Sequence, residues 1–199
     1  PPVKAEWGRL ACEAAGSGPF AAGSVGAGTG AVSAGIKGGL GTASLVMACG
    51  ITVAALVAVN SHGTIVNPNT GRLWEQGLEI DDEFGKAGRR AVKTPPLPAY
   101  RAGRNTTIGV IATNAALSKV HTLKIAQMAH DGMARAIRPA HTMFEGDSIF
   151  CLATGEKQLP EASGTYMDPQ ALHLSELGHA AADCLSRAII RGVLSARGM

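Results

Sequence analysis

Two residues in the middle of the chain, Asn105 and Thr106, have the types and the position for nucleophilic chemistry. They stand where a polar turn ends and the apolar, β-branched run of residues 107–113 begins, a pattern that predicts a buried strand. A threonine at the mouth of such a strand exposes its hydroxyl at the sheet edge. If the chain were cut before Thr106, the new α-amine, with a reference pKa of about 8, could take the proton of that hydroxyl. This stretch alone fits equally well a threonine that merely begins a strand.

An acid-glycine-acid triplet, Glu145, Gly146 and Asp147, precedes a second apolar run over residues 148–154. Alternate side chains of an extended backbone share a face, so the two carboxylates are predicted to point the same way. Two close carboxylates raise the pKa of at least one of them unless a cation lies between them. The ammonium group of a free Thr106 would be such a cation. The alternative interpretation is a solvated turn.

Two further polar side chains, Asn60 and Lys37, lie next to predicted strands. Asn60 ends an apolar run, where it can form a turn or donate an amide hydrogen bond to an oxyanion. Lys37 is the one charged residue of the glycine-rich segment 16–41, and a lone lysine is usually solvated. Because glycine is a poor helix former, that segment predicts tight turns and closely packed strands. A nucleotide-binding loop is the weaker interpretation, since neither a preceding strand nor a following helix is evident.

The elements that must position these residues follow from periodicity and from helix breakers. Ser118 is the predicted N-cap of a helix that Pro139 ends, and Asp168 and Pro169 are predicted to open a long C-terminal helix. The inward face of that last helix is predicted to begin at Leu172. The remaining expected elements are a helix over residues 7–15, strands over 50–60 and 64–66, a mobile linker over 75–104, and the strands over 107–113 and 148–154.

The composition narrows the class of protein. With 199 residues, 46% of them hydrophobic and 17% charged, the chain is long enough for one globular domain and short for two. An aromatic share of 4% and a net charge of +3 without a concentrated basic run argue against a nucleic-acid partner. No signal peptide opens the chain and its most apolar run, residues 51–59, is too short to span a bilayer, which argues against a membrane partner.

Cysteines and histidines give no sign of a metal or cofactor. The four cysteines are scattered without a C-x-x-C pair, which is typical of reduced thiols in a cytoplasmic protein. His141 and Glu145 are four residues apart but lie beyond the predicted helix stop at Pro139, so we expect no metal site there. The chain opens with Pro1 in what reads as the middle of a loop, and we expect that an N-terminal part of the gene product is missing.

Three segments together resemble a family of self-cleaving aminopeptidases and amidases. That family contains the L-aminopeptidase/D-esterases, the β-peptidyl aminopeptidases and the 6-aminohexanoate (nylon) oligomer hydrolases. The segments are Asn-Thr-Thr-Ile-Gly-Val-Ile-Ala-Thr-Asn-Ala-Ala-Leu-Ser from Asn105, His-Asp-Gly-Met-Ala-Arg-Ala-Ile-Arg-Pro-Ala-His-Thr from His130, and the Glu-Gly-Asp triplet before Ile-Phe-Cys-Leu-Ala-Thr.

The resemblance implies an α/β fold, a four-layer α/β/β/α sandwich similar to that of N-terminal-nucleophile hydrolases, with its N-terminal part absent here. It implies a single hydrolase domain over residues 1–199 whose precursor cuts itself between Asn105 and Thr106. Residues 1–105 would end the large subunit, and residues 106–199 would form the small subunit with Thr106 as its nucleophile. It further implies no cofactor and an oligomer of processed pairs.

The same resemblance assigns roles to the other candidates. Asn60 matches the asparagine that stabilises the oxyanion, and Lys37 matches a lysine of the site in nylon oligomer hydrolases. Glu145 and Asp147 match the pair that binds the nucleophile's amine and hydroxyl. The first acid is glutamate where relatives carry aspartate or serine, and one extra methylene moves a carboxylate by about 1 Å, enough to alter positioning.

We therefore expect Thr106 to act twice, first on the Asn105 carbonyl and then on a substrate amide through an acyl-enzyme. The expected partners are short peptides or ω-amino acid oligomers. An acyltransferase of the ornithine acetyltransferase type is an alternative enzyme, since that class also cleaves itself. A non-catalytic, glycine-rich oligomeric scaffold is the alternative without chemistry.

Overall fold

A four-stranded sheet forms the centre of the computed structural model, which describes residues 4–93, 95–100, 105–161 and 169–196. The strands lie in the order β3 (Gly39–Val46), β4 (Thr52–Val59), β5 (Ile108–Ala115) and β6 (Ser148–Lys157). The first two pairings are antiparallel, whereas β5 and β6 are parallel. A parallel pair needs a crossover connection, and α3 (Lys119–Ala136) provides it.

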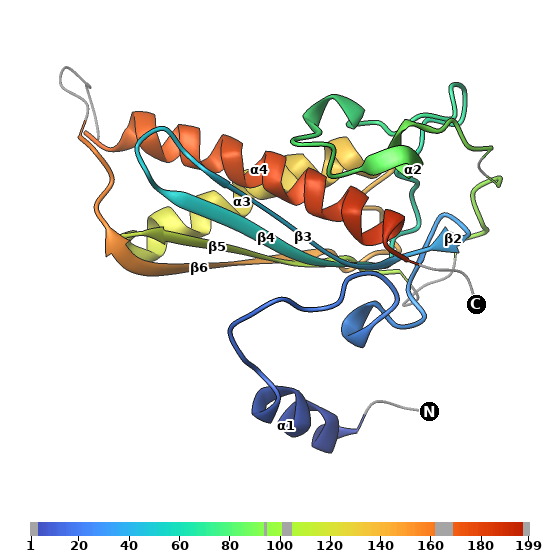
Figure 1. Cartoon of the computed structure of the whole chain (residues 1–199), viewed down its shortest axis with the longest axis horizontal. Helices are drawn as coiled ribbons and strands as arrows, with labels where there is room; N and C mark the ends of the chain where they lie inside the picture. The colour runs from blue at the N-terminus through green and yellow to red at the C-terminus, as the bar shows by residue number, and fades with distance from the viewer. Residues whose placement is uncertain (1–3, 94, 101–104, 162–168, 197–199) are drawn as a thin grey trace.

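Two long helices, α3 and α4 (Ala171–Leu194), cover one face of this sheet (Figure 1). Side chains alternate along a strand, and in β4 the alternate residues Val53 to Val59 are buried beneath the helices. The close approach of α4 depends on glycine, because a Cβ at Gly41 would lie 2.0 Å from the backbone oxygen of Ala188. The apolar core therefore lies between the sheet and this helix layer.

The opposite face of the sheet carries no helix layer in the part of the chain that the structure describes. Large apolar side chains on this face are exposed, namely Leu56, Ile108, Phe150 and Leu152. The predicted mixed α/β fold with layered helices and sheet is confirmed. Of the four layers of the expected sandwich, the described residues form one sheet layer and one helix layer.

The N-terminal segment is built from short elements, as the glycine-rich composition predicts. It contains α1 (Ala5–Glu13), a 3-10 turn η1 (Gly26–Gly28) and a two-stranded hairpin of β1 (Val32–Ser33) and β2 (Ile36–Lys37). Gly35 turns the hairpin with a φ of 82°, which favours glycine. Helix α1 has no buried residue and stands apart from the sheet in Figure 1.

Most expected boundaries agree with the structure to within a few residues. The Ser118 side chain accepts a hydrogen bond from the His121 N–H and caps α3, which ends at Ala136 before the predicted stop. Helix α4 begins later than expected, at Ala171, and the predicted cap Asp168 lies outside the described residues. Leu172 is 49% exposed rather than inward, because it lies in the first turn, ahead of the first buried residue of that helix.

The prediction of a linker over residues 75–104 is wrong for its first part. A 3-10 turn η2 (Gln76–Leu78) and a short helix α2 (Gly85–Arg89) lie there, and Phe84 between them is buried in the core. Glu83 forms a hydrogen-bonded ion pair with the buried Arg187 of α4. The sequence does not reveal these elements because they are too short to show a hydrophobic period. Phe84 and Glu83 attach the segment to the rest of the fold.

The predicted strand over residues 64–66 is also wrong. Thr64 pairs only with Arg138 and Val66 only with Leu73, each as a single isolated bridge. The β-branched residues that suggested a strand are buried there instead: Thr64, Ile65 and Val66. These three consecutive residues are therefore buried without pairing to a neighbouring strand as part of a sheet.

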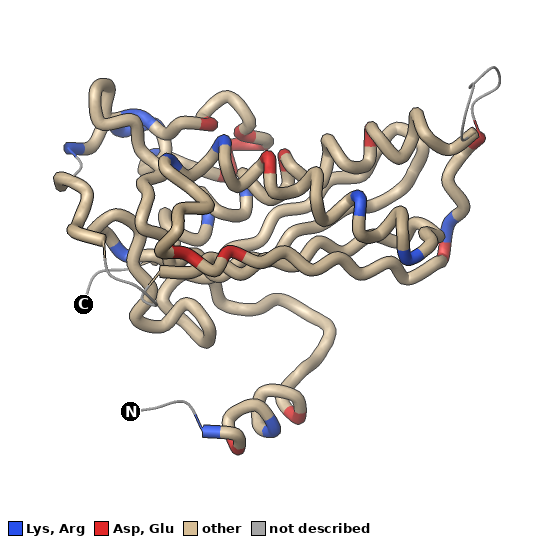
Figure 2. The backbone as a smooth tube through the Cα atoms, turned by 180° about the vertical axis from the view of Figure 1, so that it is seen from behind, with Lys and Arg blue, Asp and Glu red and all other residues tan. Residues whose placement is uncertain are grey.

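Charged side chains are spread over the molecule. Figure 2 shows Lys and Arg interspersed with Asp and Glu, mainly on helices and loops, and neither sign forms a continuous stripe along the described backbone.

Among the described residues, every helix is too short or too polar to cross a membrane.

Candidate active site

The Thr106 hydroxyl lies against the peptide carbonyl that precedes it. Its Oγ1 donates to the backbone oxygen of Asn105 at 2.6 Å and accepts the Gly146 N–H at 3.3 Å. The Thr106 N–H donates to the backbone oxygen of Asn60 at 2.7 Å. The end of β4 therefore holds the amide of Thr106, while the 145–147 triplet holds its hydroxyl.

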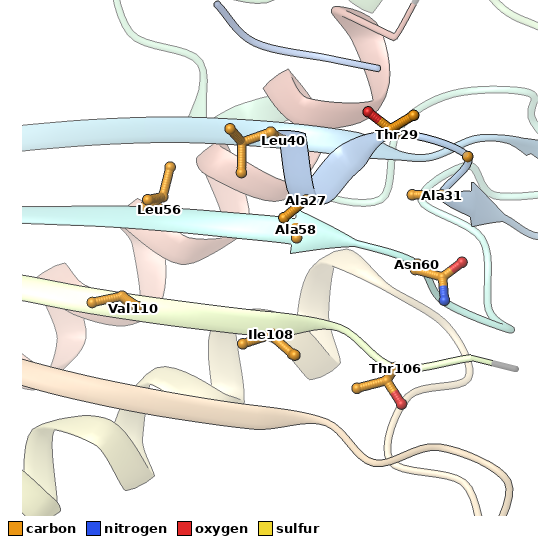
Figure 3. Close-up of a pocket in the computed structure, with 11 residues that line it drawn as sticks. Ala27, Thr29, Ala31, Leu40, Leu56, Ala58, Asn60, Thr106, Ile108 and Val110 are labelled. Atoms are coloured by element: carbon orange, nitrogen blue, oxygen red, sulfur yellow. The ribbon is translucent and has the colours of Figure 1, made fainter. Parts of the chain in front are cut away.

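Asn60 faces Thr106 from the end of the neighbouring strand. Its Oδ1 accepts the Val32 N–H of β1 at 3.1 Å. This contact orients the side-chain amide, and Figure 3 shows its nitrogen on the side of Thr106 with the oxygen turned away. An amide N–H in this place can donate to an oxyanion formed beside the threonine hydroxyl.

Glu145 binds backbone on one side of the nucleophile. Its Oε1 accepts the His62 N–H at 2.9 Å, and its Oε2 accepts the N–H and the hydroxyl of Thr142 at 3.0 and 2.9 Å. The residue also pairs with Asn105 in a parallel bridge. Glu145 therefore fixes the chain that leads up to the Asn105–Thr106 bond.

Asp147 binds backbone on the other side. Its Oδ1 accepts the Thr107 N–H at 2.8 Å, and its Oδ2 accepts from the backbone N–H and from Nδ1 of His141 at 3.2 and 2.9 Å. The carboxylate side chain is only 3% exposed. In this continuous chain the two acids thus hold the backbone around Thr106, and the Thr106 N–H itself goes to Asn60.

Lys37 is not brought to the pocket of Thr106. It is half-buried on β2 and lines a second cavity with Arg90 and Lys93. Its strand partner is Val32, whose N–H binds the side chain of Asn60. Lys37 is thus connected to the site through the hairpin.

A pocket of about 510 Å³ opens beside Thr106 and Asn60 on the helix-free face of the sheet (Figure 3). Among the described residues that line it, none carries a charged side chain. Apart from Thr106 and Asn60, the lining is mostly apolar and small: Ala27, Thr29, Gly30, Ala31, Leu40, Leu56, Ala58, Ile108 and Val110. The pocket can therefore accept an uncharged, aliphatic group next to the hydroxyl.

A stack of three aromatic rings near the site was missed by sequence reasoning. The Tyr100 ring is stacked on His62, with centroids 3.9 Å apart, and on Phe144, with centroids 4.6 Å apart. His62 is 1% exposed, and its Nδ1 has no hydrogen-bond partner among the described residues. This stack attaches the chain shortly before Asn105 to residues next to Glu145.

Other candidate nucleophiles and metal ligands are poorly placed for chemistry. Burial raises the pKa of the Cys151 and Cys184 thiols to about 11, so both are protonated at neutral pH. Within the described ranges, no three His, Cys, Asp or Glu side chains are grouped as they would be around a metal ion.

An α/β fold with a strand-start threonine whose hydroxyl touches the preceding carbonyl defines a candidate N-terminal-nucleophile site. The chain belongs to peptidase family S58, which it matches over residues 2–199. It is 43% identical over 202 residues to an uncharacterized aminopeptidase of Mycobacterium tuberculosis, covering 97% of this chain and 58% of the relative. It is 31% identical over 134 residues to the 6-aminohexanoate-oligomer endohydrolase of Paenarthrobacter ureafaciens, covering 67% of this chain and 36% of that protein.

Solved structures agree on the fold. A β-aminopeptidase of Burkholderia sp. superimposes with a TM-score of 0.68 at 31% identity, over 98% of this chain and 52% of that one. The L-aminopeptidase D-Ala-esterase/amidase of Ochrobactrum anthropi, described as a variant of the Ntn hydrolase fold, gives 0.64 at 23% identity, over 94% and 48% of the two chains. The chain thus spans 58% of the length of the Mycobacterium tuberculosis relative and about half of each of the two solved chains.

Proposed function

We propose that this protein is a self-processing amide hydrolase in which Thr106 first cuts the Asn105–Thr106 bond and then serves as the nucleophile toward substrates. The observation that carries the proposal is the 2.6 Å contact between Thr106 Oγ1 and the Asn105 carbonyl oxygen. It keeps the hydroxyl at the one peptide bond whose cleavage would give Thr106 a free amine. Membership of a peptidase family supports the reaction class.

The self-cleavage follows from these contacts. Thr106 Oγ1 attacks the Asn105 carbonyl carbon and the bond to the Thr106 nitrogen breaks, so that the acyl group moves from nitrogen to oxygen and the hydroxyl proton passes to the nitrogen. Water then hydrolyses the ester, leaving a carboxylate on Asn105 and an amine on Thr106. The Gly146 N–H and the Asn60 carbonyl hold the two reacting atoms of Thr106 before the cut.

In the processed protein, the Thr106 amine would take the hydroxyl proton while Oγ1 attacks a substrate amide. The side-chain amide of Asn60 would stabilise the oxyanion. Glu145 and Asp147 would keep the backbone around the amine in place through their contacts with residues 62 and 107. Lys37 lies outside the Thr106 pocket and would act only by supporting the hairpin whose Val32 N–H binds Asn60.

We further propose that the substrates are amides of short peptides or of ω-amino acid oligomers. The described lining of the Thr106 pocket favours an aliphatic acyl group, because none of these residues carries a charged side chain. Both classes occur in the names of relatives, one a β-aminopeptidase and another a 6-aminohexanoate-oligomer endohydrolase. A panel of α-peptides, β-peptides and aminohexanoate oligomers, followed by mass spectrometry, distinguishes them.

The variant Thr106→Ala tests the function directly. It removes the attacking oxygen, so the purified chain stays uncut and amidase activity falls to background. Thr106→Ser keeps a hydroxyl and is expected to cut at a measurable rate. Intact mass of both variants and of the wild type gives the result. Cleavage between residues 105 and 106 in Thr106→Ala would refute the proposal.

A further inference from the structure

A line of three side chains runs from the backbone of Thr107, just before β5, to His130 of α3. Asp147 binds the Thr107 N–H with one carboxylate oxygen and His141 with the other, at 2.8 and 2.9 Å. His141 Nε2 lies 3.3 Å from Nδ1 of His130. The two rings meet edge to face, with centroids 4.9 Å apart. His141 therefore lies between a carboxylate at the nucleophile and a second imidazole.

The hydrogen bonds fix which nitrogen of each ring carries a proton. An ionised carboxylate only accepts, so Nδ1 of His141 must be the donor to Asp147. In a neutral ring Nε2 then accepts, and His130 must donate to it from Nδ1. The contact with Asp147 thus holds the two rings in one defined arrangement.

The backbone of His141 is adapted to this contact. Its φ is 56°, in the left-handed region that is uncommon for residues other than glycine, although asparagine, aspartate and histidine adopt it more often than the rest. In this conformation both the N–H and the ring of His141 reach the same oxygen of Asp147. A conformation that is costly by itself is thus compensated by two hydrogen bonds to one buried carboxylate.

Burial next to a second imidazole favours the neutral form of His130. Burial lowers the pKa of His130 from the ordinary value of 6.5, and His141 lowers it further, while Asp147 and Asp131 act in the opposite direction. Glu145 lies next to the pair as well, bound to Thr142. As the pH falls, protonation of His130 would place a positive charge against the ring of His141.

We propose that His141, supported by His130, is a positioning residue that fixes the Asp147 carboxylate and, through the Thr107 N–H, the segment just before β5 that carries Thr106. The inference rests on the proposed self-cleavage, whose rate it predicts. Without the His141 ring, one oxygen of Asp147 loses its side-chain donor, and the carboxylate can turn away from Thr107.

Substitutions at position 141 separate the ring's hydrogen bond from the backbone strain. Asparagine and glycine both tolerate the φ of 56°, but only asparagine places an N–H near the position of Nδ1. In the full chain, His141→Gly is expected to slow self-cleavage by about 10- to 100-fold, since misplacement of about 1 Å can cost a factor of that order. His141→Asn is expected to retain the rate within about threefold at pH 7.5.

The pH profile adds a readout that a purely structural role would not move. In the wild type, the cleavage rate is expected to fall on the acid side as His130 becomes charged beside His141, below the ordinary histidine value of 6.5. His141→Asn and His130→Ala have no second imidazole, so this part of the acid limb is expected to disappear. His121→Ala, on the same helix, is the matched control and leaves the profile unchanged.

Two results would overturn the inference. One is a His141→Gly chain that cuts as fast as the wild type, and the other is a His141→Asn chain that is as slow as His141→Gly. A wild-type chain that never cuts itself would instead refute the proposed function. In that case the ¹⁵N spectrum of the histidine rings still tests the role of His141 independently of cleavage. An unprotonated Nδ1 on His141 would contradict that role.

Discussion

Gly146 lies directly against the candidate nucleophile. Its neighbours on both sides are the carboxylates that hold the backbone around Thr106, and its own N–H contacts the Thr106 hydroxyl at 3.3 Å. A side chain at this position would meet that hydroxyl, because an added Cβ would lie 3.2 Å from Oγ1 and 3.9 Å from Cγ2 of Thr106. The glycine therefore matters for its small size as well as for its donor.

Gly146→Ala is expected to slow self-cleavage by about tenfold, because the hydroxyl must move by a few tenths of an ångström away from the Asn105 carbonyl. The melting temperature is expected to stay within about 2 °C, since a small shift of one half-buried hydroxyl costs little stability. Cleavage followed by intact mass and a thermal melt check both. Gly16→Ala, where the added Cβ meets nothing within 4 Å, is the control. An unchanged cleavage rate would contradict the assigned contact.

The residue types at the site could be predicted from the sequence, but their contacts could not. A threonine at a strand mouth, an asparagine at a strand end and an alternating acid pair are visible as local patterns. That each carboxylate binds backbone from another element depends on sequence separations of 83 and 40 residues, which no local pattern encodes. His141 was considered only as a metal ligand, and its place six residues before Asp147 was the available signal.

At the scale of elements, periodic segments were predictable and aperiodic ones were not. The strands β4 and β5 before and after the candidate nucleophile, and the capped helix α3 between β5 and β6, follow from apolar runs and from Ser118. The long strand β3 is hidden in the sequence because glycine and small residues occupy it. The glycines of β3 are required because helix α4 packs so closely on this strand that a Cβ would meet the helix backbone.

Gly41→Ala tests that contact between β3 and α4. An added Cβ would lie 2.0 Å from the Ala188 oxygen and 2.4 Å from the Gly192 nitrogen, so the helix must move off the sheet. We expect a loss of about 3 kcal/mol in the free energy of unfolding, at the upper end of typical overpacking costs. Urea denaturation measures it, with Gly77→Ala as a control in open space. Equal midpoints for the two variants would show that the helix does not approach the strand this closely.

At the scale of the whole molecule, the candidate cleavage site divides the chain in sequence but not in space. The part before Asn105 supplies β3 and β4, and the part from Thr106 on supplies β5, β6 and both long helices. Strands β4 and β5 pair over six residue pairs from Val53 with Thr113 to Ala58 with Ile108. Helix α4 packs on β3 and β4, and its Arg187 pairs with Glu83 of the first part. One hydrophobic core is therefore shared by the two parts.

Cleavage would break one covalent bond and leave this shared core intact. We therefore expect the piece that ends at Asn105 and the piece that begins at Thr106 to elute together in size-exclusion chromatography under native conditions. They should separate only in denaturant, because separation exposes the pairing edges of β4 and β5 and the apolar surface under α4. Mass spectrometry of the native peak identifies both pieces. Separate elution in native buffer would mean that the continuous chain, rather than the sheet and helix layer, holds the two parts together.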